Sequence, residues 1–173
     1  IAQACQAEAF VFLAFPLQHV RQEHEGFRLT RLRNLALAAA TGDFIVFIDG
    51  DMVLHPQFIA DHRAAAVRGR YTQGVRIHLD QARTDALLAD PLRIPGPLSR
   101  GLGGLRRIHA FHNRPLSRLC RQLGNQVVST KGCNQGFWRA DLLAANGFDE
   151  QIVGWGPEDK ELCARLMHSG IQR

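Results

Sequence analysis

The chain has 173 residues, of which 46% are hydrophobic, and it carries a formal net charge of +5. This length fits one domain, and the hydrophobic content is sufficient for a packed core, which argues against a disordered chain. The longest apolar run, residues 9–15, is far too short to span a bilayer, and no signal-peptide pattern is visible.

The first half of the chain predicts alternating strands and helices. The apolar run at residues 8–15 is typical of a short buried strand. Apolar residues at helical spacing predict a helix over 28–41 that ends at Gly42. A buried strand over 44–48 and a helix from Pro56 to about residue 68 follow.

The second half continues the alternation. A strand is expected over 71–79, and the segment 90–104 holds three prolines and four glycines, which favours a loop. A strand over 133–138, a short helix over 139–147 and a final helix over 157–170 complete the chain. The alternation predicts an α/β domain with a mainly parallel sheet flanked by helices.

Two aspartates follow the strand 44–48, at the end where open α/β sheets bind their ligands. Asp49 and Asp51 flank Gly50, which allows a sharp bend between them. Adjacent carboxylates repel each other, and a divalent cation removes the conflict. Magnesium or manganese binds with one or two carboxylates plus substrate phosphates, so the motif predicts a metal–diphosphate site. The alternative is a turn in which Asp49 is a cap and Asp51 is solvated.

A second acidic segment, "GWGPED", opens the final helix. Pro157 suits a first helical position, so Glu158 and Asp159 lie in the first turn, where acids also stabilise a helix by interaction with its dipole. Trp155 stands between two glycines, and a large ring beside carboxylates is typical of sugar binding.

The four cysteines, at positions 5, 120, 133 and 163, show no spacing typical of a zinc site. Reduced thiols are typical of the cytoplasm, which is the predicted location.

The charge is concentrated in one stretch. Between Asp90 and Asp141 there is no acidic residue, while basic residues are frequent. Such a stretch could face phosphates, an acidic glycan or an anionic membrane, which predicts peripheral membrane contact; the alternative is a solvated loop. Nucleic acid is not an expected partner, because no binding motif accompanies the charge.

Three ordered blocks carry a family resemblance. They are the segment from "VRQEHEGFRLTRLRN" through "FIDGDMVLHPQFI", then "CNQGFWRADLLAANGFDE", then "GWGPEDKELCARL". Together they resemble the nucleotide-sugar-dependent glycosyltransferases of the GT-A fold, in particular the inverting family 2 enzymes that build polysaccharides, including chondroitin-type polymerases. The last two blocks are also similar to the β-1,4-galactosyltransferases. The resemblance implies that residues 1–173 form one partial catalytic domain, incomplete at both ends.

The resemblance also implies a donor site. Asp51 would bind Mn²⁺ or Mg²⁺ directly, and Asp49 would approach the ribose or a metal-bound water, so both belong to the metal site. The residues expected near the nucleotide are Phe27, Arg28, Arg33, Asn34, Asp49 and Gly50. The implied partners are a nucleotide-sugar donor, with UDP as the nucleotide, and a glycan or lipid-linked acceptor.

On the acceptor side, the resemblance assigns Trp155 and Gly156 to sugar contacts, Glu158 to acceptor binding and Asp159 to the role of general base. The sequence departs from the family pattern at Pro157, where relatives have a second glycine. The family's nucleotide-base turn is not found near the N-terminus. A histidine that often completes the metal shell lies downstream of this helix in relatives, and His168 comes too early to match it, because it lies on the same helix as Asp159.

Two other functions compete with sugar transfer. A nucleotidyltransferase shares the general fold and a metal–phosphate site. A non-catalytic domain that binds a glycan would need no base.

Overall fold

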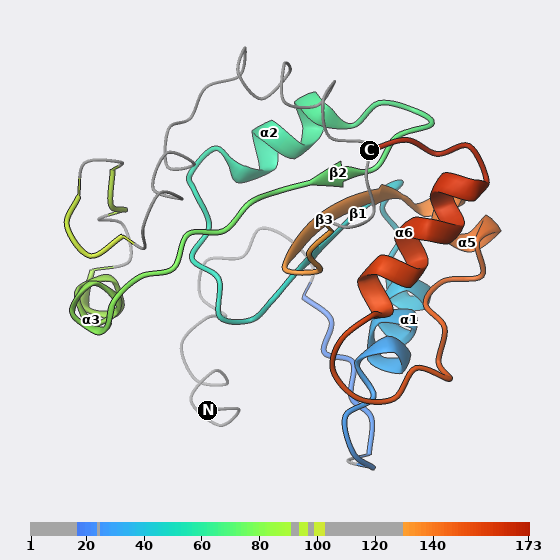
Figure 1. The fold of residues 1–173 in the computed structure, drawn as a ribbon, viewed down its shortest axis with the longest axis horizontal. Coiled ribbons are helices and arrows are strands. Elements are labelled where there is room, and N and C mark those ends of the chain that lie inside the picture. Colours follow the sequence, from blue (N-terminus) through green and yellow to red (C-terminus); the bar gives the residue numbers. More distant parts are fainter. Residues whose placement is uncertain (1–16, 24, 91–93, 97–98, 103–129) are drawn as a thin grey trace.

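The computed structural model describes residues 17–23, 25–90, 94–96, 99–102 and 130–173 (Figure 1). The predicted strand at 8–15 lies outside these residues, as does most of the basic stretch between Asp90 and Asp141. In chain order the elements are α1 (Leu29–Ala39), β1 (Phe44–Ile48), α2 (Phe58–Ala65), β2 (Thr72–Gln73), α3 (Gln81–Ala89), β3 (Asn134–Trp138), α5 (Arg139–Ala144) and α6 (Glu158–His168).

The sheet has the strand order β1-β3-β2, with β3 at its centre. Phe44 pairs with Trp138 and Ile48 with Asn134, so β1 and β3 are antiparallel, and β2 is antiparallel to β3 as well. It follows that β1 and β2 run in the same direction on the two sides of β3. The carboxyl ends of β1 and β2 therefore meet the amino end of β3 at one edge of the sheet.

Helices alternate with strands as an α/β fold requires, but the prediction of a mainly parallel sheet is wrong for the pairings that the structure describes. The prediction assumed that each strand joins its neighbour through a short helical crossover, which forces parallel pairing. Because β3 follows β2 only after a long intervening segment, the chain can enter β3 from either end.

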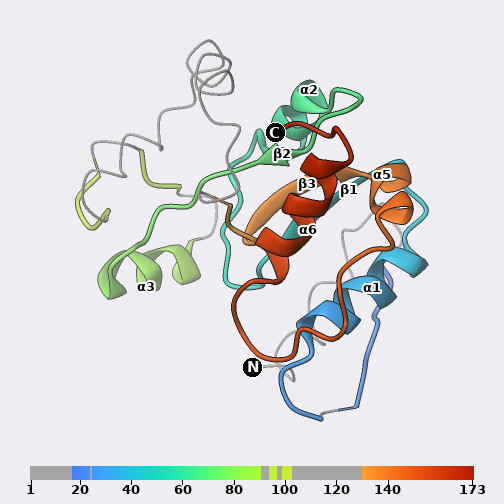
Figure 2. The same cartoon turned by 45° about the vertical axis from the view of Figure 1, so that its right-hand side comes forward.

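The core forms where α1, α5 and α6 gather at the sheet, as Figures 1 and 2 show, while α3 stands apart from them. Its buried members come from helices, from β3 and from the segments beside β2 and after α5: Leu37, Tyr71, Phe137, Leu142, Phe148, Leu162, Cys163 and Leu166. In α6, Leu162 and Leu166 are one helical turn apart on the buried face. Burial of each such side chain contributes about 1.5–3 kcal/mol.

Most predicted elements are present with shifted ends. The strand over 44–48 is confirmed as β1, whose β-branched and aromatic residues suit a half-buried strand. α2 begins two residues after Pro56, and only two residues of the predicted strand 71–79 form β2. α3 was not predicted; the side chain of its N-cap, Asp80, accepts a hydrogen bond from the backbone N–H of Arg83.

Of the four cysteines, Cys133 and Cys163 lie in the part of the chain that the structure describes, and both are buried with free thiols. Among the described helices, none is long and apolar enough to cross a membrane.

His62 of α2 is buried and fastens the helix to the sheet. Its Nε2 lies 2.8 Å from Asn134 Oδ1, and its Nδ1 lies 3.0 Å from Thr72 Oγ1. Burial lowers the pKa of His62 below 6.5, although the hydrogen bond with Asn134 and the charge of Asp61 act in the opposite direction. The native state therefore favours a neutral imidazole.

This burial predicts a pH-dependent stability. The contribution of His62 should be complete above pH 6.5 and should fall as the pH drops through the lowered native pKa, because the unfolded chain binds the proton first. Denaturant titrations from about pH 7.5 to about pH 5 should show a shallower decline for His62→Gln than for the wild type. The exposed His78, replaced by glutamine, is the control. Equal slopes for the wild type and His62→Gln would refute this account.

Candidate functional site

Four of the predicted site residues, Arg33, Asp49, Glu158 and Asp159, gather near the sheet edge where β1 ends and β3 begins. Asp49 directly follows β1, and its backbone N–H donates to the carbonyl of Cys133 at 3.3 Å. Thr130, Lys131 and Gly132 lead into β3 at the same edge. The carboxylate of Asp49 is thereby held by backbone pairing beside the segment that precedes β3.

Arg33 of α1 links this edge to the start of α6. Its Nη2 lies 3.6 Å from Asp49 Oδ1, and its Nη1 lies 3.5 Å from Glu158 Oε1. The side chains of Arg33 and Glu158 are each only 9% exposed, whereas that of Asp49 is 38% exposed. One buried guanidinium therefore faces two carboxylates from different parts of the chain.

Two aromatic rings lie close to the guanidinium of Arg33. Its Cζ lies 5.3 Å from the ring centroid of Phe148 and 5.9 Å from that of Phe47. The two rings contact each other edge to face, with centroids 5.2 Å apart. Such rings favour a cation energetically, and the burial of Arg33 and Glu158 strengthens the attraction between these two side chains.

Glu158 and Asp159 open α6, and both are buried. Gly156 N–H donates to Glu158 Oε2 at 3.2 Å, and Lys160 N–H donates to Asp159 Oδ1 at 2.8 Å. The first turn of a helix leaves backbone N–H groups free, which explains why two acids are accommodated there.

Gly132 permits a close approach between the two sides of the site. A Cβ built on Gly132 would lie 3.3 Å from Arg33 Nη2, from Asp159 Cβ and from Asp159 Oδ2. The segment before β3, the guanidinium of Arg33 and the carboxylate of Asp159 are therefore immediate neighbours. A side chain at position 132 would displace one of them.

Burial is the largest influence on Asp159 and raises the pKa of its carboxyl group, and the negative charge of Glu158 acts in the same direction. The backbone N–H groups of Lys160 and Gly132, together with the charge of Arg33, oppose this rise. The result is a carboxylate that holds a proton more readily than an exposed aspartate does. A raised pKa of this kind suits a group that accepts a proton during a reaction.

Asp51 and Gly50 are exposed beyond Asp49. A Cβ on Gly50 would meet no heavy atom within 4 Å. Asp51 forms no hydrogen bond or ion pair with any residue that the structure describes. The two aspartates offer carboxylates of the kind that magnesium or manganese takes as ligands, and such an ion needs few of them. Arg33 faces Asp49 but forms no ion pair with Asp51 among the described residues. No cluster of three or more potential ligand side chains occurs among the described residues.

Two other predicted nucleotide contacts lie at the start of α1. Arg28 forms an ion pair with Glu25 at 2.5 Å, and the carbonyl of Phe27 accepts a hydrogen bond from Gly154 N–H at 3.0 Å. This last bond attaches the loop that carries Trp155 to the start of α1. The Trp155 side chain, at 88% exposure, is open to solvent.

Asn34 is engaged with the loop after α5. Its Nδ2 donates to the carbonyl of Phe148 and to Glu150 Oε1, both at 2.9 Å, and its Oδ1 accepts from Phe148 N–H at 2.8 Å. Its amide thus fastens α1 to this loop.

The site depends on two residues that the sequence did not single out, Gly132 and Gln73. The Nε2 of Gln73 donates to the carbonyl of Lys131 at 2.8 Å, and its Oε1 accepts from Gln135 Nε2 at 3.1 Å. Gln73 therefore holds the segment that approaches Asp159. The glycine before "CNQGFW" could have indicated a close approach of the backbone to another segment. By contrast, nothing in the local sequence distinguishes Gln73 from other strand residues.

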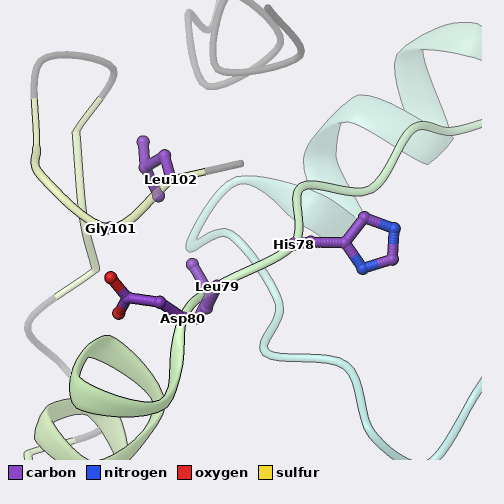
Figure 3. A pocket seen from close by; sticks show the side chains of 5 residues that line it. All are labelled: His78, Leu79, Asp80, Gly101 and Leu102. Atoms are coloured by element: carbon purple, nitrogen blue, oxygen red, sulfur yellow. The ribbon is translucent and has the colours of Figure 1, made fainter. Parts of the chain in front are cut away.

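A cavity of about 310 Å³ lies elsewhere, between the start of α3 and residues 101–102 (Figure 3). His78, Leu79, Asp80, Gly101 and Leu102 line it. None of these residues belongs to the predicted site, and the carboxylate of Asp80 is used to cap α3.

The hydrogen bonds of Asn34 predict a structural effect. Asn34→Ala should lower the free energy of unfolding by about 1–3 kcal/mol, because the backbone groups of Phe148 lose their partners. Denaturant titration measures this change. Arg31→Ala, at an exposed position of the same helix, should change it by less than about 0.5 kcal/mol, and equal effects of the two substitutions would contradict the role given to Asn34.

Comparisons of the sequence with known proteins show which family the chain resembles. The profile described as glycosyl transferase family 2 matches residues 4–130, and that described as the N-terminal domain of galactosyltransferase matches residues 118–173. The chain is 28% identical over 170 residues to a chondroitin synthase of Escherichia coli, an alignment that covers 89% of this chain and 24% of that protein. It is 28% identical over 176 residues to a chondroitin synthase of Pasteurella multocida strain Pm70, covering 89% of this chain and 17% of that protein.

The chain thus spans about a quarter or less of the length of these curated relatives. The first profile alone matches well over half of its residues, including α1, the two aspartates and β2. On this evidence, the chain belongs to glycosyl transferase family 2.

Proposed function

We propose that this chain carries the donor and base sites of a metal-dependent glycosyltransferase that moves a sugar, with inversion, from a nucleotide-sugar to a glycan or lipid-linked acceptor. The observation that carries the proposal is the pair of contacts from Arg33 to Asp49 and to Glu158. They bring the aspartate motif after β1 and the acidic start of α6 to one place. Family membership supports the nucleotide-sugar as donor.

On the donor side, Asp51 and Asp49 are the proposed holders of Mn²⁺ or Mg²⁺. The cation, when bound, would offset the negative charge that develops on the leaving diphosphate. The open space beside Gly50 leaves room for the diphosphate at this edge. UDP is the proposed nucleotide, on the strength of the sequence resemblance.

On the acceptor side, Asp159 is the proposed general base. It would take the proton from the acceptor hydroxyl as the oxygen attacks the anomeric carbon and the nucleoside diphosphate leaves. Its burial and raised pKa support this role, because a more basic carboxylate accepts a proton more readily. Glu158 would hold the acceptor, since its carboxylate is fixed by Gly156 N–H and Arg33.

Trp155 and Gly156 are proposed to contact the sugars. The exposed indole of Trp155 offers a broad apolar face, and the apolar face of a sugar ring matches such a surface. The two relatives are chondroitin synthases by name, which favours a growing polysaccharide as the acceptor. A cytoplasmic location with peripheral membrane contact remains part of the proposal.

Metal-dependent nucleotide binding is the first test. Calorimetry should show that the wild type binds UDP at least tenfold more tightly with Mn²⁺ than without it, because the cation joins the aspartates to the diphosphate. Asp51→Ala should remove this difference. Asp61→Ala, at an aspartate on α2, is the matched control. If UDP affinity is the same in all conditions, the metal site is absent.

The general base is the second test. Asp159→Asn should lower the transfer rate by about a hundredfold or more while leaving metal-dependent UDP binding intact. It should also leave the melting temperature at pH 7 unchanged or raised. The native carboxyl has a raised pKa, so it favours folding only while protonated, and this contribution is lost as the pH rises through the native pKa. Transfer at the wild-type rate would place the base elsewhere.

A further inference from the structure

We infer that Arg33 is a positioning residue that couples the donor-side Asp49 to the acceptor-side Glu158, and that it does not itself bind the nucleotide. The inference rests on the proposed function and replaces the role in nucleotide binding that the sequence resemblance implies for Arg33. In this role the guanidinium keeps the donor-side carboxylate of Asp49 and the acceptor-side carboxylate of Glu158 in a fixed relative orientation.

The first argument is accessibility. The Arg33 side chain is only 9% exposed, and its Nη1 atom is buried without a hydrogen-bond partner among the described residues. That atom faces Glu158 Oε1 at 3.5 Å, so the ion pair is its nearest electrostatic partner. Because Nη1 is buried, a phosphate or base approaching from solvent has no direct access to it.

The second argument is charge. Asp49, Glu158 and Asp159 are three acids gathered around one cation. Without Arg33, the buried carboxylate of Glu158 would lose its cationic partner while the charge of Asp159 remained beside it, which is unfavourable in a poorly solvated environment. With it, each branch of the guanidinium faces one carboxylate, and the planar shape fixes the direction of both.

The third argument is the close approach at Gly132. The Nη2 branch of Arg33 and the carboxylate of Asp159 both lie 3.3 Å from the position of a Cβ on Gly132. The guanidinium therefore lies near the proposed base, and its positive charge acts on the carboxyl group of Asp159. Displacement of Arg33 would disturb the acceptor side more than it would disturb the exposed Asp51, because among the described residues Arg33 forms ion pairs with Asp49 and Glu158 and not with Asp51.

The test separates positioning from nucleotide binding. Arg33→Met and Arg33→Lys are made in the full-length protein, with Arg31→Met as a control on the exposed side of the same helix. Two quantities are compared: kcat, with the UDP-sugar and oligosaccharide that the wild type turns over fastest, and the Kd for UDP with Mn²⁺. We expect kcat to fall at least thirtyfold in Arg33→Met and at least tenfold in Arg33→Lys, while the Kd for UDP changes less than threefold.

The lysine variant is informative because it keeps the positive charge but offers one ammonium group in place of two branches. A wild-type kcat in Arg33→Lys would show that charge alone suffices, and it would overturn the inference. A tenfold or greater rise in the Kd for UDP in Arg33→Met, with kcat unchanged, would identify Arg33 as a nucleotide ligand instead. A lower melting temperature with normal kcat per folded molecule would reduce Arg33 to a structural role and also overturn the inference.

If Arg33→Met does not fold, the neutral pair Arg33→Met/Glu158→Gln carries the test, because it removes both members of the buried ion pair. Its kcat should be within threefold of that of Glu158→Gln alone, since the coupling is already lost in the single variant. If kcat of the double variant instead falls by the product of the two single-variant factors, the two residues act independently, and the inference is overturned. If the wild-type protein neither binds UDP with Mn²⁺ nor transfers sugar, the proposed function fails. The results that overturn the inference about Arg33 alone are different, because in them the wild type is active and only the variants behave unexpectedly.

Discussion

The guanidinium of Arg33 is the interaction on which the rest of the site depends. It lies between a carboxylate that follows β1 and a carboxylate that opens α6, at 3.6 and 3.5 Å. These distances are those of ion pairs and not of short hydrogen bonds, so attraction is carried mainly by charge in a poorly solvated setting. Without this cation, burial of Glu158 and Asp159 side by side at the start of one helix would be unfavourable.

The arrangement uses buried charge where an apolar core would be more stable. A buried ion pair often contributes little net stability compared with well-packed hydrophobic residues, because desolvation of both groups opposes their attraction. The neighbouring core of Leu162 and Leu166, one and two turns further along α6, supplies the stability that the start of the helix does not. The acids at the start of α6 thus belong to a helix that packs into the core through other residues.

Local sequence was sufficient for elements whose cause is local. The run "FIVFI" predicted β1 with its observed bounds, and Pro157 marked the start of α6 within one residue. The functional identity of Asp49, Asp51, Glu158 and Asp159 was also proposed from motifs. What the sequence did not predict depends on distant partners. The direction of β3 follows from pairings with strands far away along the chain, and the role of Arg33 depends on two carboxylates that no spacing relates to it.

Although the central strand is antiparallel to its neighbours, the carboxyl end of β1 still lies where several segments of the chain meet. Because β1 and β2 both pair with β3 in the antiparallel sense, they run parallel to each other, and their carboxyl ends share an edge. The segment before β3 reaches the same edge, where Gln73 at the end of β2 binds the backbone of Lys131. An antiparallel strand therefore brings its preceding segment to the carboxyl ends of its neighbours. In this chain that placement is what brings Gly132 against Asp159 and Arg33.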